Sequence, residues 1–426
     1  MRIAFVHPGM DVKGGAENII IWLADGLGRR GHDVRVFTEN YKPEYWPREM
    51  TERLDVAKMP SLLFGRFGKS ERLRCWERER QLARMLEGFD VAVGQHFPSY
   101  YWAIRARERA AGAWKVVWLC QEPMRRLYAD VTDMHLVNFL KFAPPGSEND
   151  HLWSAAQERM RRMKRHGRRF ARDARNIRWD LHASREIDLV LANSAFTALN
   201  VRQVFRTRPQ VCHLGIPLPP EAEYVRGEYA AVLTTLAVRK NVPTIIRAMH
   251  RLVAVRGRKD IRLRIAGQGP DRAALDQLAA ELGVGANVEF TGPLPDANLP
   301  EFFRRARVVI YVPLDEPFGL VPLEALAAKT PVVVSDHGGP AEIIEHGVTG
   351  LHVNPFDAAA IADAVEKLWD DDAKARELAE AGCRRVREYY SLEAFVSRFE
   401  TALEGMGARR ESVIADGPKA SAAHGA

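Results

Sequence analysis

The sequence has few cysteines and no long apolar run. Its four cysteines among 426 residues form no Cys-x-x-Cys pair, so neither a disulfide framework nor a zinc site is predicted, and a reducing compartment such as the cytoplasm is expected. No apolar stretch approaches the roughly 20 residues that a membrane-spanning helix needs. At the N-terminus only Ile3 to Val6 are continuously apolar, which predicts a first strand and not a signal peptide.

Two short motifs are also missing. No Gly-x-Gly-x-x-Gly follows the first strand, where the sequence is HPGMDVKGGAEN, and this disfavours a dinucleotide-dependent oxidoreductase. The one run of adjacent aspartates, 370–372, falls in a predicted exposed helical region far from the expected site. We therefore expect no metal ion and no cofactor. The formal charge of +7 favours an anionic partner, but nucleic acid is not expected because no recognised motif accompanies the charge.

The length and the pattern of apolar runs predict two α/β domains. A chain of 426 residues exceeds what one hydrophobic core usually organises. Short β-branched runs alternate with helical patterns, which indicates parallel sheets with right-handed crossovers. A turn-rich stretch, 214–229, separates the two sets of runs. The predicted strands lie at 2–7, 33–38, 90–94, 115–120 and 188–193, and then at 231–237, 261–267, 287–292, 306–313, 330–336 and 349–354.

We therefore predict two doubly wound parallel-sheet domains that face a deep cleft, because such sheets bind ligands beyond the carboxyl ends of their strands. An N-terminal domain is expected at 1–218 and a C-terminal domain at 219–390. A last helix at 391–406 is expected to cross back to the first domain. The Ala-, Gly- and Ser-rich residues 407–426 are expected to be disordered.

The stretch LDEPFGLVPLEALA, residues 314–327, is the most informative segment. It follows a predicted strand, so Glu316 lies where α/β sheets build their sites. Gly319 lets the backbone approach a ligand closely. Pro322 is tolerated only in a first helical turn, so a helix is predicted to begin near Gly319 or Leu320.

The free N–H groups of that helix would point at the cleft and favour an anion. Glu324 lies about one turn inside the helix, where a carboxylate can accept both hydroxyls of a ribose. The alternative is that Glu316 caps the helix and Glu324 is a solvated surface residue.

A family resemblance favours the functional interpretation. EPFGLVPLEALA, followed by KTPVVVSDHGGPAEIIEHGVTGLHV, resembles the signature region of the family 4 retaining glycosyltransferases. The ordered set consists of the Glu-x7-Glu spacing, the Phe-Gly between the acids and the Gly-Gly-x-x-Glu loop. The resemblance spans residues 1 to about 400 and is strongest at 231–355. It implies the GT-B fold of two Rossmann-like domains and a nucleoside diphosphate sugar as donor.

The resemblance also implies which residues hold the donor. Lys240 matches the lysine of an Arg-x4-Lys pair that binds the donor diphosphate, although Thr235 stands where the family has the arginine. Arg239 is adjacent and is a candidate to compensate. Glu316 would hold sugar hydroxyls and Glu324 the ribose. Further donor contacts are expected from the Gly-rich turn at Gly267, from the backbone at Phe318, Gly319 and Leu320, and from Gly14 and Gly15 after the first strand.

The N-terminal half supplies the expected sugar and acceptor contacts. WLCQEPMRR resembles a family stretch with a cleft histidine, but Gln121 occupies that place. Glutamine cannot transfer a proton, yet it can donate and accept hydrogen bonds to sugar hydroxyls. On the acceptor side we expect Glu122, Arg125, Arg178 and Asp180, while a loop salt bridge is the alternative for the first two. Ser194 is predicted to cap a helix.

The segment 158–178 carries ten Lys or Arg and two acids, with apolar residues interleaved. Such a segment can bind an anionic membrane surface. A solvated charged face is the commoner meaning of a charge run. A peripheral contact with the inner face of the membrane is therefore one of two open interpretations.

The sequence predicts a retaining, metal-independent hexosyltransferase that uses a nucleoside diphosphate sugar and a glycan or lipid-linked acceptor. The alternative is a catalytically impaired relative that still binds a nucleotide sugar. Gln121 and Thr235 motivate this alternative.

Overall fold

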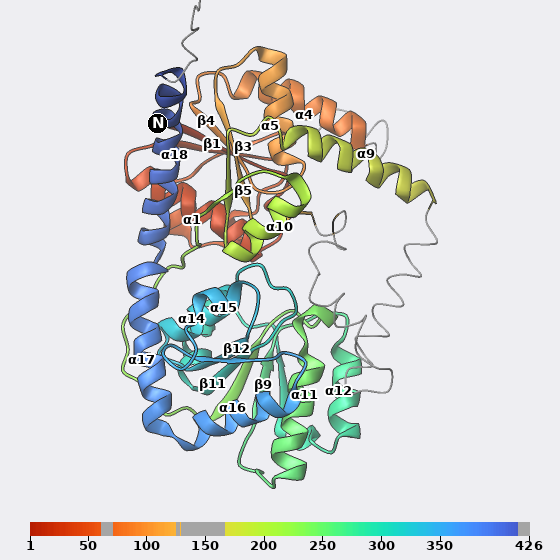
Figure 1. Cartoon of the computed structure of the whole chain (residues 1–426), viewed down its shortest axis with the longest axis vertical. Helices are drawn as coiled ribbons and strands as arrows, with labels where there is room; N and C mark the ends of the chain where they lie inside the picture. The colour runs from red at the N-terminus through yellow and green to blue at the C-terminus, as the bar shows by residue number, and fades with distance from the viewer. Residues whose placement is uncertain (61–70, 125–127, 129–166, 416–426) are drawn as a thin grey trace, which may run out of the picture.

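The computed structural model describes residues 1–60, 71–124, 128 and 167–415, and two parallel sheets organise them. Figure 1 shows one sheet in each of two domains, with helices packed around both and a pair of C-terminal helices running along one side of the molecule. This confirms the predicted GT-B architecture of two Rossmann-like domains. The boundaries proposed between the domains remain a prediction.

The N-terminal sheet has the strand order β3-β2-β1-β4-β5-β6-β7, and every neighbouring pair is parallel. The order reverses between β1 and β4, which is where ligands bind in such sheets. The strands are β1 (Arg2–His7), β2 (Asp33–Thr38), β3 (Asp55–Lys58), β4 (Val91–Gly94), β5 (Lys115–Cys120), β6 (Leu189–Ala192) and β7 (Gln210–Val211). The helices around it are α1 (Gly15–Arg29), α2 (Arg48–Thr51), α4 (Glu71–Met85), α5 (Ser99–Ala110), α9 (Gly167–Ala183) and α10 (Ala195–Phe205).

The C-terminal sheet repeats this arrangement in the order β10-β9-β8-β11-β12-β13. Its strands are β8 (Tyr229–Leu233), β9 (Leu263–Ala266), β10 (Val288–Gly292), β11 (Ala306–Tyr311), β12 (Val332–Ser335) and β13 (Leu351–Val353). Its helices are α11 (Val242–His250), α12 (Arg272–Glu281), α13 (Leu299–Arg304), α14 (Leu320–Ala327), α15 (Gly339–Ile343), α16 (Ala358–Asp370) and α17 (Asp372–Tyr389).

The strongest apolar runs became the central strands. All residues of β4, β11 and β12 are buried, as expected for strands that helices cover on both faces. Two short edge strands, β3 and β7, were not predicted. Their sequences, DVAK and QV, contain polar or charged residues and no continuous apolar run, because an edge strand buries less surface than a central one.

The chain crosses between the domains twice, and the two crossings touch. The connection after β7 passes the junction between α17 and the last helix, α18 (Leu392–Ala415). The backbone N–H of Ile216 donates to the carbonyl of Tyr390, and the N–H of Leu392 donates back to Ile216. At Gly215 a Cβ atom would lie 2.3 Å from the carbonyl oxygen of Ser391, so only glycine fits there.

α18 lies against the N-terminal domain (Figure 1). Arg30 pairs with Glu393 at 2.7 Å and with Glu400 at 3.0 Å, and the ring of Phe399 stacks on Phe5. The helix extends to Ala415, beyond the end predicted at residue 406, so residues 407–415 are helical where a disordered tail was predicted. Residues 416–426 lie outside the described residues.

Candidate active site

A cleft of about 720 Å³ lies between the carboxyl ends of the two sheets. Residues from both domains line it, as the sequence predicted for two facing Rossmann-like domains. Eleven of the predicted site residues are part of its lining: Gly15, Gln121, Glu122, Arg239, Lys240, Gly267, Glu316, Phe318, Gly319, Leu320 and Glu324.

Lys240 and Glu316 form an ion pair inside this cleft. Lys240 Nζ donates to Glu316 Oε2 at 2.7 Å, and both side chains are mostly buried. Lys240 ends a 3₁₀ turn after β8, and Glu316 follows β11, so neighbouring strands bring the two together. A cation and an anion held side by side can bind a phosphate and a sugar hydroxyl of the same ligand.

The helix α14 points its N-terminus at this pair. It begins at Leu320, as predicted, directly after Gly319 with φ of +101°. A Cβ atom at Gly319 would also lie 3.1 Å from the ring of Tyr311. A side chain would be strained there, so glycine allows the abrupt helix start that exposes free N–H groups to the cleft.

Glu324 lies one turn further along α14 and also lines the cleft. Burial raises the pKa of its carboxyl to about 7, and the nearby Asp296 raises it in the same direction. The carboxyl of Glu324 is largely surrounded by protein but is accessible from the cleft. It can therefore accept hydrogen bonds from a ligand bound there.

The Gly-Gly-x-x-Glu loop supports the site from behind. A Cβ atom at Gly338 would lie 2.7 Å from the carbonyl oxygen of Glu316, and one at Gly339 would lie 2.2 Å from Cα of Phe318. The backbone N–H of Gly339 donates to the Glu316 carbonyl at 2.8 Å. The two glycines therefore allow the loop to pack directly on the backbone that carries Glu316.

The glutamate of that loop joins the two domains. The backbone N–H groups of Ala195 and Phe196, at the start of α10, donate to the Glu342 carboxylate at 2.8 Å and 2.7 Å. Ser194 caps the same helix, as predicted, and its hydroxyl also donates to the carbonyl of Pro317. The sequence indicated the cap but not this contact across the cleft.

Thr235 occupies the position where the resemblance implies an arginine of the diphosphate-binding pair. Thr235 is exposed and lines the cleft. The guanidinium of Arg239 donates to the backbone carbonyls of Leu314 at 3.3 Å and Asp315 at 2.9 Å. Arg239 therefore braces the loop before Glu316 in this structure, and its compensation for Thr235 stays a prediction.

Two glycines lie at the close approaches that the sequence suggested. At Gly15 a Cβ atom would lie 3.4 Å from Leu320 Cδ1, so the start of α1 faces the start of α14. Gly14 precedes it as the N-cap of α1 and does not itself line the cleft. At Gly267, φ is +130° and a Cβ atom would overlap the carbonyl oxygen of Thr234. Glycine is required at Gly267 by the backbone alone.

Gln121 and Glu122 follow β5 and reach the cleft. The hydroxyl of Thr197 donates to the backbone carbonyl of Gln121. The side-chain nitrogen of Gln121 is buried and has no hydrogen-bond partner within the described ranges. It is an uncommitted donor in the cleft wall.

The other acceptor-side predictions are placed differently. Asp180 is fully buried in the N-terminal domain, where the hydroxyl of Tyr100 donates to it, and it is not part of the cleft lining. Burial raises its pKa to about 7, partly offset by hydrogen bonds from Tyr100 and Tyr128. Arg178 is exposed on α9 and lies outside the cleft lining. The prediction for Arg125 lies outside the described residues.

Sequence reasoning missed several polar residues of the cleft, among them Lys13, His96 and Asp296. Lys13 Nζ pairs with Asp296 of the other domain at 2.5 Å, which bridges the cleft near Glu324. His96 lines the wall beside Gln121. His96 follows the predicted strand at 90–94, and Lys13 precedes the Gly-Gly pair, so position after a strand could have indicated both.

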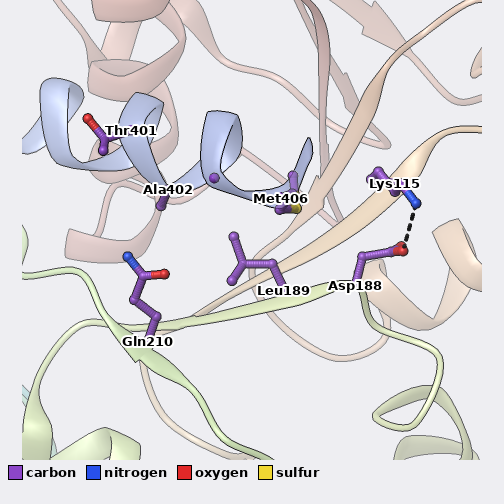
Figure 2. Close-up of a pocket in the computed structure, with 8 residues that line it drawn as sticks. Lys115, Asp188, Leu189, Gln210, Thr401, Ala402 and Met406 are labelled. Carbon is purple, nitrogen blue, oxygen red and sulfur yellow. Dashed lines mark ion pairs between the residues drawn. The ribbon is translucent and has the colours of Figure 1, made fainter. Parts of the chain in front are cut away.

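A second cavity, of about 320 Å³, lies at the amino ends of β5, β6 and β7. Figure 2 shows α18 forming one side, with Thr401, Ala402 and Met406, and the strands forming the other. Lys115 and Asp188 pair at 3.4 Å on its wall and satisfy each other. It lies at the strand ends opposite to those of the cleft, so the cleft is the candidate active site.

The two facing parallel-sheet domains define a protein of the GT-B fold class. The family description "Glycosyltransferase Family 4" matches residues 13–218, and "Glycosyl transferases group 1" matches residues 220–385. The chain belongs to the family 4 glycosyltransferases.

Similar proteins agree with this assignment. Over 431 residues, 93% of this chain and 94% of the relative, the chain is 25% identical to human alpha-1,3/1,6-mannosyltransferase ALG2. Over 176 residues, 40% of this chain and 44% of the relative, it is 36% identical to an uncharacterized glycosyltransferase of Methanocaldococcus jannaschii. The fold is similar to that of HepE from Anabaena in complex with UDP, with a TM-score of 0.68, 17% identity, and coverage of 95% of this chain and 100% of that one.

Only part of the basic segment 158–178 belongs to the described residues. Residues 158–166 lie outside the described residues, and 167–178 form part of α9. None of the helices in the described ranges combines the length and the apolar character that a bilayer crossing requires.

Proposed function

We propose that this glycosyltransferase moves a hexose from a nucleoside diphosphate sugar to a glycan or lipid-linked acceptor, with retention of the anomeric configuration and without a metal ion. The observation that carries the proposal is the shared cleft, in which the Lys240–Glu316 pair, the N-terminus of α14 and Glu324 face one space. Human ALG2 is named as a mannosyltransferase, and HepE was solved with UDP and with UDP-glucose, which supports this donor class.

The donor is proposed to lie along the cleft from α14 to β5. Glu324 accepts the ribose hydroxyls, and Lys240 with the backbone N–H groups from Phe318 to Leu320 holds the diphosphate. Glu316 and Gln121 hold the hydroxyls of the sugar. Gly15, which Gly14 precedes as the N-cap of α1, approaches the phosphates from the other domain. The charges of Lys240 and of the helix N-terminus offset the diphosphate without a metal ion.

The transfer itself needs no protein base in this scheme. The bond from the anomeric carbon to the phosphate oxygen breaks, and the acceptor hydroxyl oxygen forms the new bond on the same face of the sugar. The proton of that hydroxyl passes to the leaving phosphate oxygen. Lys240, 2.7 Å from Glu316 before the donor binds, then stabilises the negative charge that develops on the leaving group.

Glu122 is the cleft-lining candidate for contact with the acceptor. The basic segment 158–178, which includes Arg178, is proposed to contact a membrane surface, because its positive charge favours anionic lipid. A cytoplasmic enzyme at the inner face of the membrane would meet a lipid-linked acceptor there. Binding to anionic vesicles, compared with neutral vesicles, tests this part separately.

The first experiment is the substitution Glu324→Ala, with binding of UDP and GDP measured by calorimetry at pH 8, where the native carboxyl is mostly ionised. Loss of a carboxylate that accepts the ribose hydroxyls should weaken nucleotide binding by about 10- to 100-fold. Glu404→Ala, at an exposed position on α18, is the control and should not change the affinity. Unchanged affinity of Glu324→Ala would remove the ribose assignment.

The second experiment separates an active enzyme from an impaired relative. The purified protein is incubated with labelled UDP-glucose, UDP-galactose and GDP-mannose, with and without a glycan acceptor, and both hydrolysis and transfer are followed. Turnover of any donor supports the transferase proposal. Tight nucleotide-sugar binding with no turnover of any kind would instead favour the impaired relative that Gln121 and Thr235 suggested.

A further inference from the structure

Three neighbouring strands of the N-terminal sheet end side by side at the cleft. β1, β4 and β5 are parallel, and their register aligns Val6 with Gly94 and Gly94 with Trp118. The residues just beyond these strands are therefore neighbours across the sheet. His96 follows β4 by two residues, and Gln121 follows β5 directly.

His96 faces the cleft on this wall. It lines the cleft together with Gln121 and Glu122. His7, at the end of β1, is buried behind it, with the two ring centroids 5.9 Å apart. His96 lies in the short turn between β4 and α5, and the ring of His7 packs against its ring.

The chemical state of His96 suits a sugar hydroxyl. Burial lowers the pKa of His96, and Glu122 raises it by less, so the imidazole is neutral at neutral pH. A neutral imidazole carries one donor and one acceptor, as a hydroxyl group does. The pKa of His7 is lowered to about 3 by burial and by His96, so no positive charge arises next to the site.

The side chain of Gln121 offers a sugar hydroxyl a hydrogen-bond donor that no other described residue uses. Its side-chain nitrogen is buried without a hydrogen-bond partner among the residues that the structure describes, so it is a donor that a ligand oxygen can satisfy. The resemblance to the family implies a histidine at this position. Here the imidazole of His96, in the turn that follows the neighbouring strand β4, lines the same cleft.

We propose that His96 and Gln121 together hydrogen-bond the hydroxyls of the transferred sugar. The family resemblance implies that a single histidine at position 121 makes this contact in related enzymes. The inference rests on the proposed function, because it requires a nucleotide sugar in the cleft. It predicts that His96 contributes to binding of the sugar and not to binding of the nucleotide.

The test compares a nucleotide with its sugar derivative in the full-length protein. UDP and UDP-glucose, and GDP and GDP-mannose, are titrated into wild type, His96→Ala and His96→Phe by calorimetry. Both variants should bind the nucleotide with wild-type affinity and the sugar nucleotide about tenfold more weakly, with a matching loss of turnover. His96→Phe keeps an aromatic ring in the cleft wall but has no hydrogen-bonding nitrogen. It therefore controls for a change of packing in the alanine variant. His182→Ala, at an exposed position on α9, is the control.

A rescue variant distinguishes a sugar contact from a packing role. His96→Ala combined with Gln121→His returns an imidazole to the same wall from the next strand and should regain most of the lost affinity for the sugar nucleotide. If the His96 variants weaken nucleotide and sugar nucleotide equally, or if neither changes, the inference is overturned. If wild type binds no nucleotide at all, the proposed function is contradicted, and this inference is contradicted with it because it rests on that function.

Discussion

Glu324 is an acid in a place that favours its neutral form. Protein surrounds its carboxyl, and Asp296 adds negative charge nearby, so its pKa rises to about 7. Without ligand the native protein holds this proton at pH values where the unfolded chain, with a pKa near 4.5, has released it. Stability therefore falls as the pH rises from about 4.5 to about 7, and the penalty is complete above that range.

Glu324→Gln should remove this penalty in the ligand-free protein. At pH 5 the substitution should change the free energy of unfolding little. At pH 8 the variant should be more stable than wild type by on the order of 1–3 kcal/mol, since the amide has no charge to bury. Denaturant unfolding at the two pH values measures this difference. An equal effect at both pH values would contradict the shifted pKa.

Asp180 shows why burial alone does not identify a site residue. Its pKa is also about 7, but its environment is the closed core beneath α5 and not a cleft. Tyr100 donates to it from that core. The basic-acidic pair of Arg178 and Asp180 could not separate these two situations, because the packing of α9 on the rest of the domain decides whether its carboxyl faces a core or a cleft.

At the scale of elements, the contact of α18 with α1 holds the C-terminal segment on the first domain. A Cβ atom at Gly26 of α1 would lie 2.5 Å from Val396 of α18, whereas at Gly28, two residues on, no atom lies within 4 Å in the described structure. The two helices thus pack closely at Gly26, a position where α1 has no side chain.

Gly26→Leu and Gly28→Ala form a matched pair that tests this contact. Leucine at position 26 should force α18 away and lower the free energy of unfolding by about 1–3 kcal/mol. Alanine at position 28 should be neutral or stabilise by up to about 1 kcal/mol, because alanine favours helix over glycine. Thermal and denaturant unfolding measure both. A destabilised Gly28→Ala with a tolerant Gly26→Leu would place the contact elsewhere.

At the scale of the whole molecule, the domains are joined by more than the two chain crossings. Glu342 of the C-terminal domain accepts two backbone N–H groups at the N-terminus of α10 in the other domain. His213, at the start of the interdomain connection, lies 3.2 Å from the same carboxylate and 3.0 Å from the hydroxyl of Tyr389. These contacts set how the two walls of the cleft face each other.

Glu342→Ala should loosen this junction. The loss of a carboxylate cap at a helix N-terminus should lower the free energy of unfolding by about 1–2 kcal/mol and speed hydrogen exchange in the first turn of α10. Exchange followed by mass spectrometry on peptides that begin at Ala195 measures the local effect. Glu345→Ala, an exposed glutamate three residues on, is the control. Unchanged exchange at α10 would show that the domains hold together without this contact.

Local sequence determined the elements and the outline of the site. Apolar runs of strand length predicted β1, β2 and β5 residue for residue. Pro322 and Gly319 fixed the start of α14, because proline is tolerated only in the first turn and glycine adopts the positive φ before it. Glu316 and Glu324 then had to lie at the carboxyl end of a strand and one turn inside a helix.

Only the tertiary structure decided which strand ends and which domain surfaces meet. His96 became a neighbour of Gln121 because β4 and β5 are adjacent, and Lys13 met Asp296 because the two domains face each other. The side chain of Arg239 donates to the backbone carbonyls of Leu314 and Asp315, and the side chain of Asp180 is buried in the core. Pairing across strands and across a cleft depends on contacts far apart in the chain. The spacing of residues along the sequence carries no information about those contacts.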